Sequence, residues 1–183
     1  GSGKTIFTDL IMGLRRANEG KFEIDSIEID ESNIKDWRKK IAHVPQKIFT
    51  TNDSIINNIA LGLESSLIDT AKIKNVIKLS QLEKDIEELT DGLETKIGSS
   101  ANNFSSGQIQ RLGIARALFK ESEILILDEA TSALDNKTEK EFLEVIKKIK
   151  KNKTIFFTTH REKPLEVCDE IFEIQDKSLI KIS

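Results

Sequence analysis

Cysteine is scarce in this sequence, and long apolar runs are absent from it. The single cysteine, Cys168, excludes a disulfide within the chain and fits a reducing compartment. No apolar run approaches the roughly 20 residues that a membrane-spanning helix requires. Basic residues are not in excess either: 28 Lys and Arg against 31 Asp and Glu give a net charge of −3. No overall positive field therefore points to nucleic acid.

The length suits one domain with a hydrophobic core. A chain near 183 residues buries roughly 70% of the surface that its unfolded form exposes. We find no internal repeat and no low-complexity segment, and the balance of 38% apolar to 32% charged residues is typical of a globular domain. There is no initiator methionine and no signal peptide. Because the first residues already belong to a motif, we expect a fragment of a longer protein.

The most informative stretch is Ile124–Leu127, which is followed by Asp128 and Glu129. Four consecutive aliphatic residues without polar alternation predict a strand buried on both faces, as in a parallel sheet. Such a strand opens at its carboxyl end into the crevice where α/β sheets bind ligands. There Asp128 could hold Mg²⁺, and Glu129 could reach a water molecule. Taken alone, the stretch is better explained as a core strand that ends in a solvated acidic turn.

The chain begins with Gly1-Ser2-Gly3-Lys4-Thr5, the second half of the phosphate-binding motif G-x-x-x-x-G-K-[ST]. Gly1 and Gly3 would let backbone N–H groups close on phosphate oxygens. Lys4 would meet the β- and γ-phosphates, and the Thr5 hydroxyl would bind Mg²⁺. We expect a helix from about Lys4 to Leu14, with its positive N-terminal end toward the same phosphates. The alternative is a glycine–serine linker ahead of a lysine-led helix.

Two other predicted strands end in polar residues. Ile41–Val44 predicts a strand that the following proline ends, and Gln46 comes directly after it. Thr154–Thr158 predicts another strand, with His160 two residues beyond. Polar surface or a structural role explains such residues in most proteins. A functional role becomes the better explanation if Gln46 and His160 face the same crevice as Asp128 and Glu129.

Phe104-Ser105-Ser106-Gly107-Gln108 leads into a predicted helix that ends at Phe119. A helix N-terminus behind small residues can bind an anion, but without further context an ordinary serine cap explains the pattern better. We further expect a short helix that Ser32 caps and that ends at Lys40, with Trp37 as a packing residue. Another helix is expected after Ser54, which would cap it. The remaining expected helices are Asp69–Leu79, Leu82–Leu89, Lys137–Lys150 and Lys163–Cys168, with strand pairs within residues 22–29 and 171–182.

In this order the motifs resemble the nucleotide-binding domain of ABC transporters, over the whole chain. That family has Walker A, a Q-loop, an L-S-G-G-Q signature, Walker B with a catalytic glutamate, a D-loop and an H-loop. The counterparts here are Gly1-Ser2-Gly3-Lys4-Thr5, Gln46, Phe104-Ser105-Ser106-Gly107-Gln108, Asp128-Glu129, Ser132-Ala133-Leu134-Asp135 and His160. The implied fold is α/β, a P-loop NTPase with a mostly parallel sheet. We expect one nucleotide-binding domain over residues 1–183, with a small helical subdomain at roughly 52–118.

The resemblance is to exporters in particular. Val44-Pro45-Gln46 followed by a phenylalanine, and Asp91-Gly92-Leu93-Glu94-Thr95, look like exporter sequences. The run Trp37-Arg38-Lys39-Lys40-Ile41 is similar to flippases for lipid-linked saccharides. The implied partners are a second nucleotide-binding domain and a transmembrane domain on the same or another chain, at the cytoplasmic face of the cell membrane, without nucleic acid.

The implied chemistry is hydrolysis of ATP with Mg²⁺. Glu129 would polarise the attacking water, with His160 on the γ-phosphate and Gln46 in support. The cation ligands would be Thr5, Gln46 and Asp128. In a head-to-tail dimer, Ser105, Ser106, Gly107 and Gln108 would act on ATP bound by the second copy, and Asp135 would communicate across the interface.

The sequence departs from the family pattern in the signature and in the loop before it. Ser106 replaces the first signature glycine and Phe104 the leucine, and a serine adds a Cβ and disfavours positive φ. Hydrolysis would then be slower, although serine is the mildest replacement, and the chain could be a degenerate clamp that binds ATP with little turnover. Gly98-Ser99-Ser100 also lacks the glutamate usual in exporters. Two more hypotheses are a soluble ABC-type ATPase, which would need a long coiled coil between Gln46 and Phe104, and another P-loop class such as a kinase.

Overall fold

The computed structural model describes residues 3–98, 104–176 and 178–183, so most of the expected loop at residues 98–103 lies outside it. Its helices are α1 (Lys4–Ile11), α2 (Ile34–Lys39), α3 (Ile55–Ile59), α4 (Thr70–Leu79), α5 (Glu83–Glu87), α6 (Ser106–Phe119) and α7 (Asn136–Ile149), with 3₁₀ turns at Ser65–Leu67, Gly92–Glu94 and Lys163–Val167. Its strands are β1 (Glu23–Ile24), β2 (Ile27–Glu28), β3 (Ile41–Val44), β4 (Asp53–Ser54), β5 (Lys96–Ile97), β6 (Ile124–Asp128), β7 (Thr154–Thr158), β8 (Phe172–Gln175) and β9 (Ser178–Lys181).

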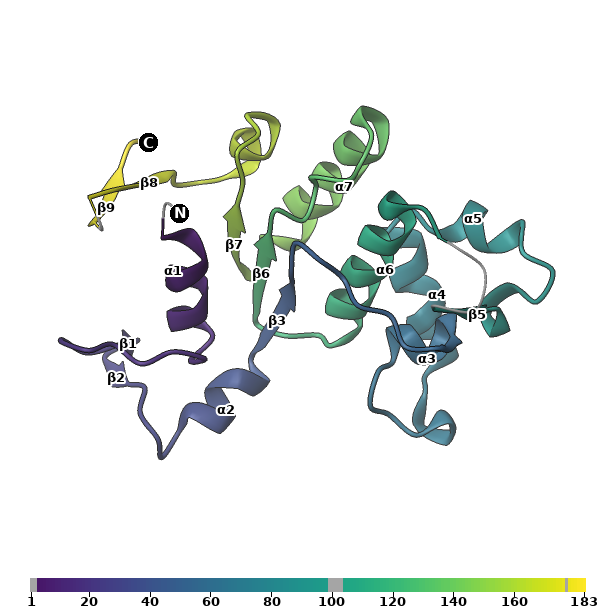
Figure 1. Ribbon diagram of the computed structural model, residues 1–183, viewed down its shortest axis with the longest axis horizontal. Coiled ribbons are helices and arrows are strands. Elements are labelled where there is room, and N and C mark those ends of the chain that lie inside the picture. Colours follow the sequence, from purple (N-terminus) through teal and green to yellow (C-terminus); the bar gives the residue numbers. More distant parts are fainter. Residues whose placement is uncertain (1–2, 99–103, 177) are drawn as a thin grey trace.

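A parallel sheet in the order β3-β6-β7 lies at the centre of the molecule (Figure 1). Its register pairs Val44 with Leu127, and Leu127 with Phe157. The carboxyl ends of all three strands therefore meet at one edge. Parallel neighbours need long crossover connections, which α3–α6 supply between β3 and β6, and α7 between β6 and β7. The three predicted strands are confirmed.

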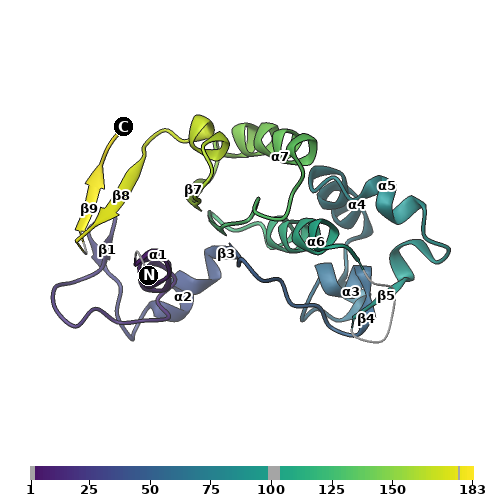
Figure 2. The same cartoon turned by 45° about the horizontal axis from the view of Figure 1, so that its top comes forward.

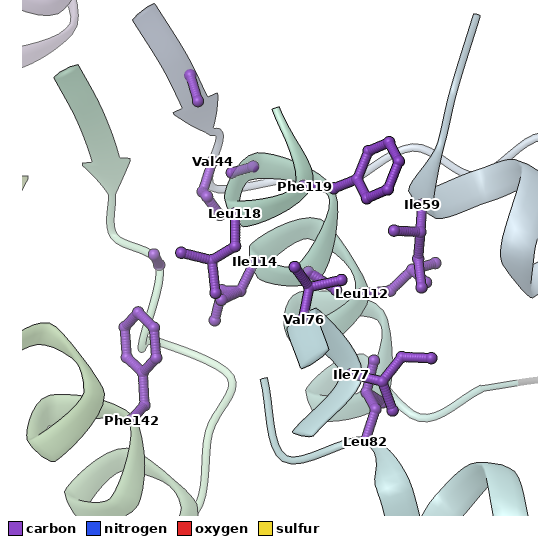
Figure 3. Close-up of a cluster of buried hydrophobic side chains, with 14 of the residues drawn as sticks. Val44, Ile59, Val76, Ile77, Leu82, Leu112, Ile114, Leu118, Phe119 and Phe142 are labelled. Atoms are coloured by element: carbon purple, nitrogen blue, oxygen red, sulfur yellow. The ribbon is translucent and has the colours of Figure 1, made fainter. Parts of the chain in front are cut away.

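β6 is buried on both faces because its alternate side chains enter two different clusters. Leu125 and Leu127 pack in the larger cluster, with residues of α6 and α7. Ile124 and Ile126 pack in the smaller cluster, with residues of α1 and α2. Figure 3 shows part of the larger cluster, with α6 side chains between those of β3, α4 and α7. An uninterrupted aliphatic strand is what two covered faces require.

Helices α3 to α6 and the short β4–β5 pair gather at one end of the molecule (Figures 1 and 2). Their buried side chains interdigitate around α6 and α4, and the contributors include Ile59, Ile73, Val76, Leu82 and Leu112. Ser54 caps α3 by accepting a hydrogen bond from Asn57 N, as predicted. A subdomain boundary at residues 52–118 stays a prediction.

Several expected helix boundaries are wrong by a few residues. α1 ends at Ile11 rather than Leu14, because Gly13 adopts a φ of 64°, the left-handed conformation that ends helices. Ser32 does not cap α2, whose N-cap is Asn33. Ser32 lies instead in the turn around Asp30, whose Oδ1 accepts hydrogen bonds from the Ser32 hydroxyl at 2.6 Å and from the Ser32 N–H at 2.8 Å.

The remaining differences are short. α5 covers Glu83–Glu87 instead of Leu82–Leu89, and the expected helix Lys163–Cys168 is a 3₁₀ turn. Trp37 is buried and its indole N–H donates to Ile11 O at 2.6 Å, which confirms the packing role. No helix in the described part of the chain is long and apolar enough to cross a membrane.

β8 and β9 form an antiparallel pair beside α1 (Figure 2). Between this pair, α1 and β7 lies a cleft of about 880 Å³. Its walls are mainly apolar, and they include Phe7, Phe156 and Ile174. Lys4 and His160 also line it, so the cleft adjoins the edge of the sheet where the strands end.

Candidate functional site

Two strand ends place their polar side chains on one carboxylate. Gln46, two residues beyond β3, donates from its Nε2 to Glu129 Oε2 at 2.8 Å. His160, two residues beyond β7, has its Nε2 3.5 Å from Glu129 Oε1. Glu129 directly follows the central strand β6, so the two outer strands deliver one group to each oxygen. The carboxylate is partly sheltered, with 24% of its side chain exposed.

Lys4 completes this group from the N-terminus of α1. Its ammonium contacts both ring nitrogens of His160, with Nδ1 at 3.3 Å. The N-cap of α1 is Gly3, with a φ of 89° and no side-chain cap, so the helix presents main-chain N–H groups at this end. Gly1 and Ser2 lie outside the described residues. Lys4, Gln46, Glu129 and His160 thus form one continuous set of contacts.

Asp128 lies on the same edge but makes a different contact. Its Oδ1 accepts a hydrogen bond from the hydroxyl of Thr158, which is its register partner on β7. Glu129 then turns away from the strand direction with a φ of 49°, and its N–H donates to Thr158 O at 3.0 Å. This left-handed conformation costs roughly 1–2 kcal/mol for a residue with a Cβ. The turn separates the two carboxylates, and only Glu129 reaches the Gln46 and His160 pair described above.

Thr5, Gln46 and Asp128 carry the kinds of oxygen atom that magnesium ions bind. A hydroxyl, an amide carbonyl and a carboxylate are hard ligands, and Mg²⁺ commonly keeps waters and substrate phosphates beside one or two carboxylates. Gln46 donates to Glu129 through its amide nitrogen, so the oxygen of the same amide is the atom that could bind the cation. Within the described ranges no three His, Cys, Asp or Glu side chains cluster as a metal site.

Residues 105–108 form the start of α6. Ser105 Oγ accepts from Gln108 N at 3.2 Å, and Gln108 Oε1 accepts from Ser105 N at 2.8 Å, a reciprocal capping box. Gln108 Nε2 also donates to Asp85 Oδ1 at 2.7 Å. These hydrogen bonds run within the helical end of the molecule, and do not join the set of contacts around Glu129.

The start of α6 corrects one expectation about the signature. Ser106 is the first residue of the helix, so it has helical dihedrals and no positive φ is required of it. Gly107 is the confined position, because a Cβ there would stand 3.2 Å from Ala133 O. The N-terminus of α6 therefore lies against the loop between β6 and α7. At position 107 a side chain would press on Ala133 O, whereas a serine at 106 is not strained.

Asp135 caps α7. Its Oδ1 accepts from the backbone N–H groups of Lys137 and Thr138 at 2.9 and 3.1 Å, and its Oδ2 from the Thr138 hydroxyl at 2.6 Å. The hydrogen bond from the Thr138 hydroxyl, followed by the backbone bonds, lowers the pKa of Asp135. The side chain is exposed and makes no described contact with Lys4, Gln46 or Glu129.

Sequence reasoning missed three residues that bond to predicted site residues or to the loop beside them. Thr158 donates to Asp128, Asp85 holds Gln108, and Arg161 bonds to the loop that leads to Asp135. Thr158 and Arg161 follow the β7 pattern directly, so their closeness to His160 could have drawn attention to them. Asp85 gave no signal, because its partner lies 23 positions away in sequence.

His43 is another polar residue near the site. It lies on β3, half-buried, and its Nε2 has no described hydrogen-bond partner. Burial lowers the pKa of His43, against the opposing effect of Asp128 and Asp9. The folded protein therefore favours the neutral imidazole.

The parallel sheet, the lysine-bearing helix N-terminus and the acidic strand end define the class: an α/β P-loop nucleoside-triphosphatase fold. A family model described as "ABC transporter" matches residues 1–132. The chain belongs to the ABC transporter family, and the fold class and family that the sequence predicted are both confirmed.

Relatives of known name agree with this assignment. The chain is 42% identical over its whole length to the "Multidrug resistance-like ATP-binding protein MdlA" of Buchnera aphidicola, and 34% identical over 99% of its length to an "ATP-dependent lipid A-core flippase" of Ralstonia nicotianae. Among solved structures, a bacterial Atm1-family ABC exporter with ATP bound matches 97% of the chain with a TM-score of 0.89 and 30% identity. The chain spans 31% of the length of each of these proteins.

Proposed function

We propose that this chain binds and hydrolyses ATP with Mg²⁺ to drive export or flipping of a substrate by an ABC transporter. The observation that carries the proposal is the set of contacts that joins Lys4, Gln46, Glu129 and His160 at one sheet edge. Family membership and the names of the relatives support the reaction class. ATP as the nucleotide and Mg²⁺ as the cation are parts of the proposal.

Phosphoryl transfer to water depends on positioning and charge neutralisation more than on covalent help. Lys4 would place its ammonium on the β- and γ-phosphates, with the main-chain N–H groups of the α1 N-terminus beside it. Thr5, Gln46 and Asp128 would hold Mg²⁺, which neutralises phosphate charge when it is bound. Thr158 would fix Asp128 in place through the hydrogen bond described above.

Glu129 is the proposed general base. Its two oxygens already face Gln46 and His160, which would orient it toward a water in line with the γ-phosphate. His160 would contact the γ-phosphate, which would come between the imidazole and the Lys4 ammonium that now meet directly. Glu129 as the base, His160 on the phosphate and Gln46 on the cation would then act side by side at one edge of the sheet.

The proposed partners are a second copy of this domain and a transmembrane domain. In a head-to-tail dimer, the start of α6 with Ser105 and Gly107 would face ATP held by the other copy, and Asp135 would lie at the interface. The names of the relatives include flippases and exporters, which supports a transmembrane partner and a place at the cytoplasmic face of the cell membrane. No nucleic acid is part of this proposal.

The test is ATP turnover by the intact transporter in lipid. Glu129→Gln should bind ATP and lose turnover by at least ~100-fold, because the amide cannot accept the proton. Glu123→Gln is the matched control, since Glu123 precedes the other end of β6 and pairs with Lys40 on the surface. Turnover of Glu129→Gln close to wild type would overturn the role of Glu129.

A degenerate ATP clamp is the second candidate, and Ser106 in the signature favours it. The helical conformation of Ser106 removes the expected backbone strain but leaves the added hydroxyl at the helix start. Negligible turnover in wild type and Glu129→Gln alike, with ATP binding retained, would establish the clamp.

A further inference from the structure

Arg161 joins the loop after β7 to the loop after β6. Its Nη2 donates to Ser132 O at 3.1 Å, and its Nη1 to Leu134 O at 3.5 Å. The same Nη1 donates to Glu139 Oε1 at 2.8 Å. One planar guanidinium therefore donates to two carbonyls of the loop that ends at Asp135, and to a carboxylate in the helix α7 that follows the loop.

The carboxylate that anchors Arg161 is buried. Glu139 lies in the first turn of α7 with 2% of its side chain exposed, and its N–H donates to Asp135 O at 2.9 Å. A buried carboxylate needs a cationic partner with good geometry. Lys163 also approaches it, with Nζ 3.7 Å from Oε2. Arg161 differs from Lys163 because it alone of the two bonds the loop carbonyls.

These hydrogen bonds matter for the site because of where Arg161 lies. Arg161 is the residue after His160, and its backbone N–H is held by Thr159 Oγ1 at 2.9 Å. A cavity of about 160 Å³ lies at the junction, lined by Glu129, Ser132, His160 and Arg161 among others. A shift of the loop that holds Ser132 and Leu134 would therefore pull on the Arg161 side chain, and through it on the backbone next to His160.

We infer that Arg161 is a positioning residue, which holds His160 in register with the loop that carries Asp135. His160 would then meet the γ-phosphate only while this loop is in place, so Asp135 at the domain interface would govern a phosphate contact inside its own subunit. The inference rests on the proposed function. Its chemistry requires the fork of arginine, because a lysine offers a single ammonium that cannot bond two carbonyls and a carboxylate in one plane.

The experiment is nucleotide affinity in the intact transporter with Glu129→Gln, which prevents turnover during the measurement. Adding Arg161→Lys should weaken ATP binding about tenfold and leave ADP binding within about twofold, since ADP has no γ-phosphate for His160 to contact. In the protein with Glu129 present, Arg161→Lys should lower kcat by about tenfold. Lys163→Ala is the matched control, which removes the other cation near Glu139 and should change neither quantity.

Equal loss of ATP and ADP affinity would show a general structural role and overturn the inference, as would no loss at all. An effect of Lys163→Ala equal to that of Arg161→Lys would also overturn it, because charge compensation of Glu139 would then explain both. If the transporter with Arg161→Lys does not assemble, ATP and ADP affinities are compared in Glu139→Gln instead. This variant keeps the guanidinium and neutralises the carboxylate that anchors it. Failure of the proposed function is visible earlier, as absent nucleotide binding in the Glu129→Gln protein before Arg161 is changed.

Discussion

Replacing Gly113 by alanine should destabilise the protein, although alanine is the better helix former. Gly113 lies inside α6, and a Cβ there would stand 2.7 Å from Ile48 Cγ1 and 3.2 Å from Ile48 Cγ2. Ile48 is two residues beyond Gln46. The segment that carries Gln46 is thus fastened to α6 by a side chain that occupies the space of the missing Cβ.

Two opposing effects decide the magnitude. Alanine in a helix interior is favoured over glycine by roughly 0.5–1 kcal/mol. Overpacking a filled position typically costs about 1–3 kcal/mol. The clash involves Cδ1 and Cγ1 of Ile48, with Cγ2 in tight contact, so it eases only if the whole Ile48 side chain rotates or moves. We expect overpacking to win, with a net loss of about 1–2 kcal/mol in unfolding free energy.

The assay is urea denaturation of four proteins: wild type, Gly113→Ala, Ile48→Ala and the double variant. Ile48→Ala removes the three atoms that would lie nearest to the new Cβ. In that background Gly113→Ala should therefore stabilise the protein by roughly 0.5–1 kcal/mol, and the effect of the substitution changes sign. A stabilisation of equal size in both backgrounds would refute the reasoning.

Three further predictions concern stability. Phe142→Ala empties a position that is 2% exposed, and should lower the unfolding free energy by about 3–5 kcal/mol in the same urea assay; a loss below about 1 kcal/mol would contradict the packing described for α7. Asp135→Ala should cost about 1 kcal/mol through loss of the α7 cap, whereas Asp135→Asn should keep most of it, and thermal denaturation of the two variants beside wild type compares them. Because burial lowers the pKa of His43, the unfolded chain binds a proton that the folded chain excludes, so stability falls as pH falls through the unfolded pKa of about 6.5. His43 can contribute at most about 1.4 kcal/mol to the loss of unfolding free energy between about pH 7.5 and about pH 5.5, and His43→Val should remove that contribution. If the unfolding free energy of His43→Val falls between these pH values as much as that of wild type, the prediction is wrong.

The central sheet could be predicted because its strands are short and unambiguous. Ile124–Leu127 has no polar residue to place on a solvated face, so burial on both sides follows from the sequence alone. Gln46 and His160 were predicted to follow strands, and parallel pairing then brings their side chains to one edge. These inferences needed only local pattern and one topological rule.

The contacts that hold the site could not be predicted in the same way. Arg161 reaches Glu139 and two carbonyls of another loop, and Gln108 reaches Asp85 in another helix. Such pairs depend on where whole elements pack, which no periodicity in a single sequence reports. Ser32 failed as a cap for a local reason, because α2 begins one residue later, with Asn33 as its N-cap, and the Ser32 hydroxyl donates to Asp30 instead.

The signature shows a different limit. Resemblance to L-S-G-G-Q suggested that Ser106 occupies a position reserved for glycine. The structure instead makes position 106 an ordinary first residue of α6 and assigns the steric restriction to Gly107, beside Ala133 O. A motif gives residue types, whereas the need for each of them depends on the backbone that surrounds it.

The segment between Pro45 and Asn52 has a mechanical consequence. Glu129 and His160 stand on the ends of two paired strands, but Gln46 begins the connection from the sheet to α3. That connection is tied to α6 by Ile48 in the space at Gly113, and by Arg116, which donates to Phe49 O at 3.1 and 3.2 Å. A small rotation of the helical end would therefore move this connection with it. The first distance to change at the site would be the one between Gln46 and Glu129.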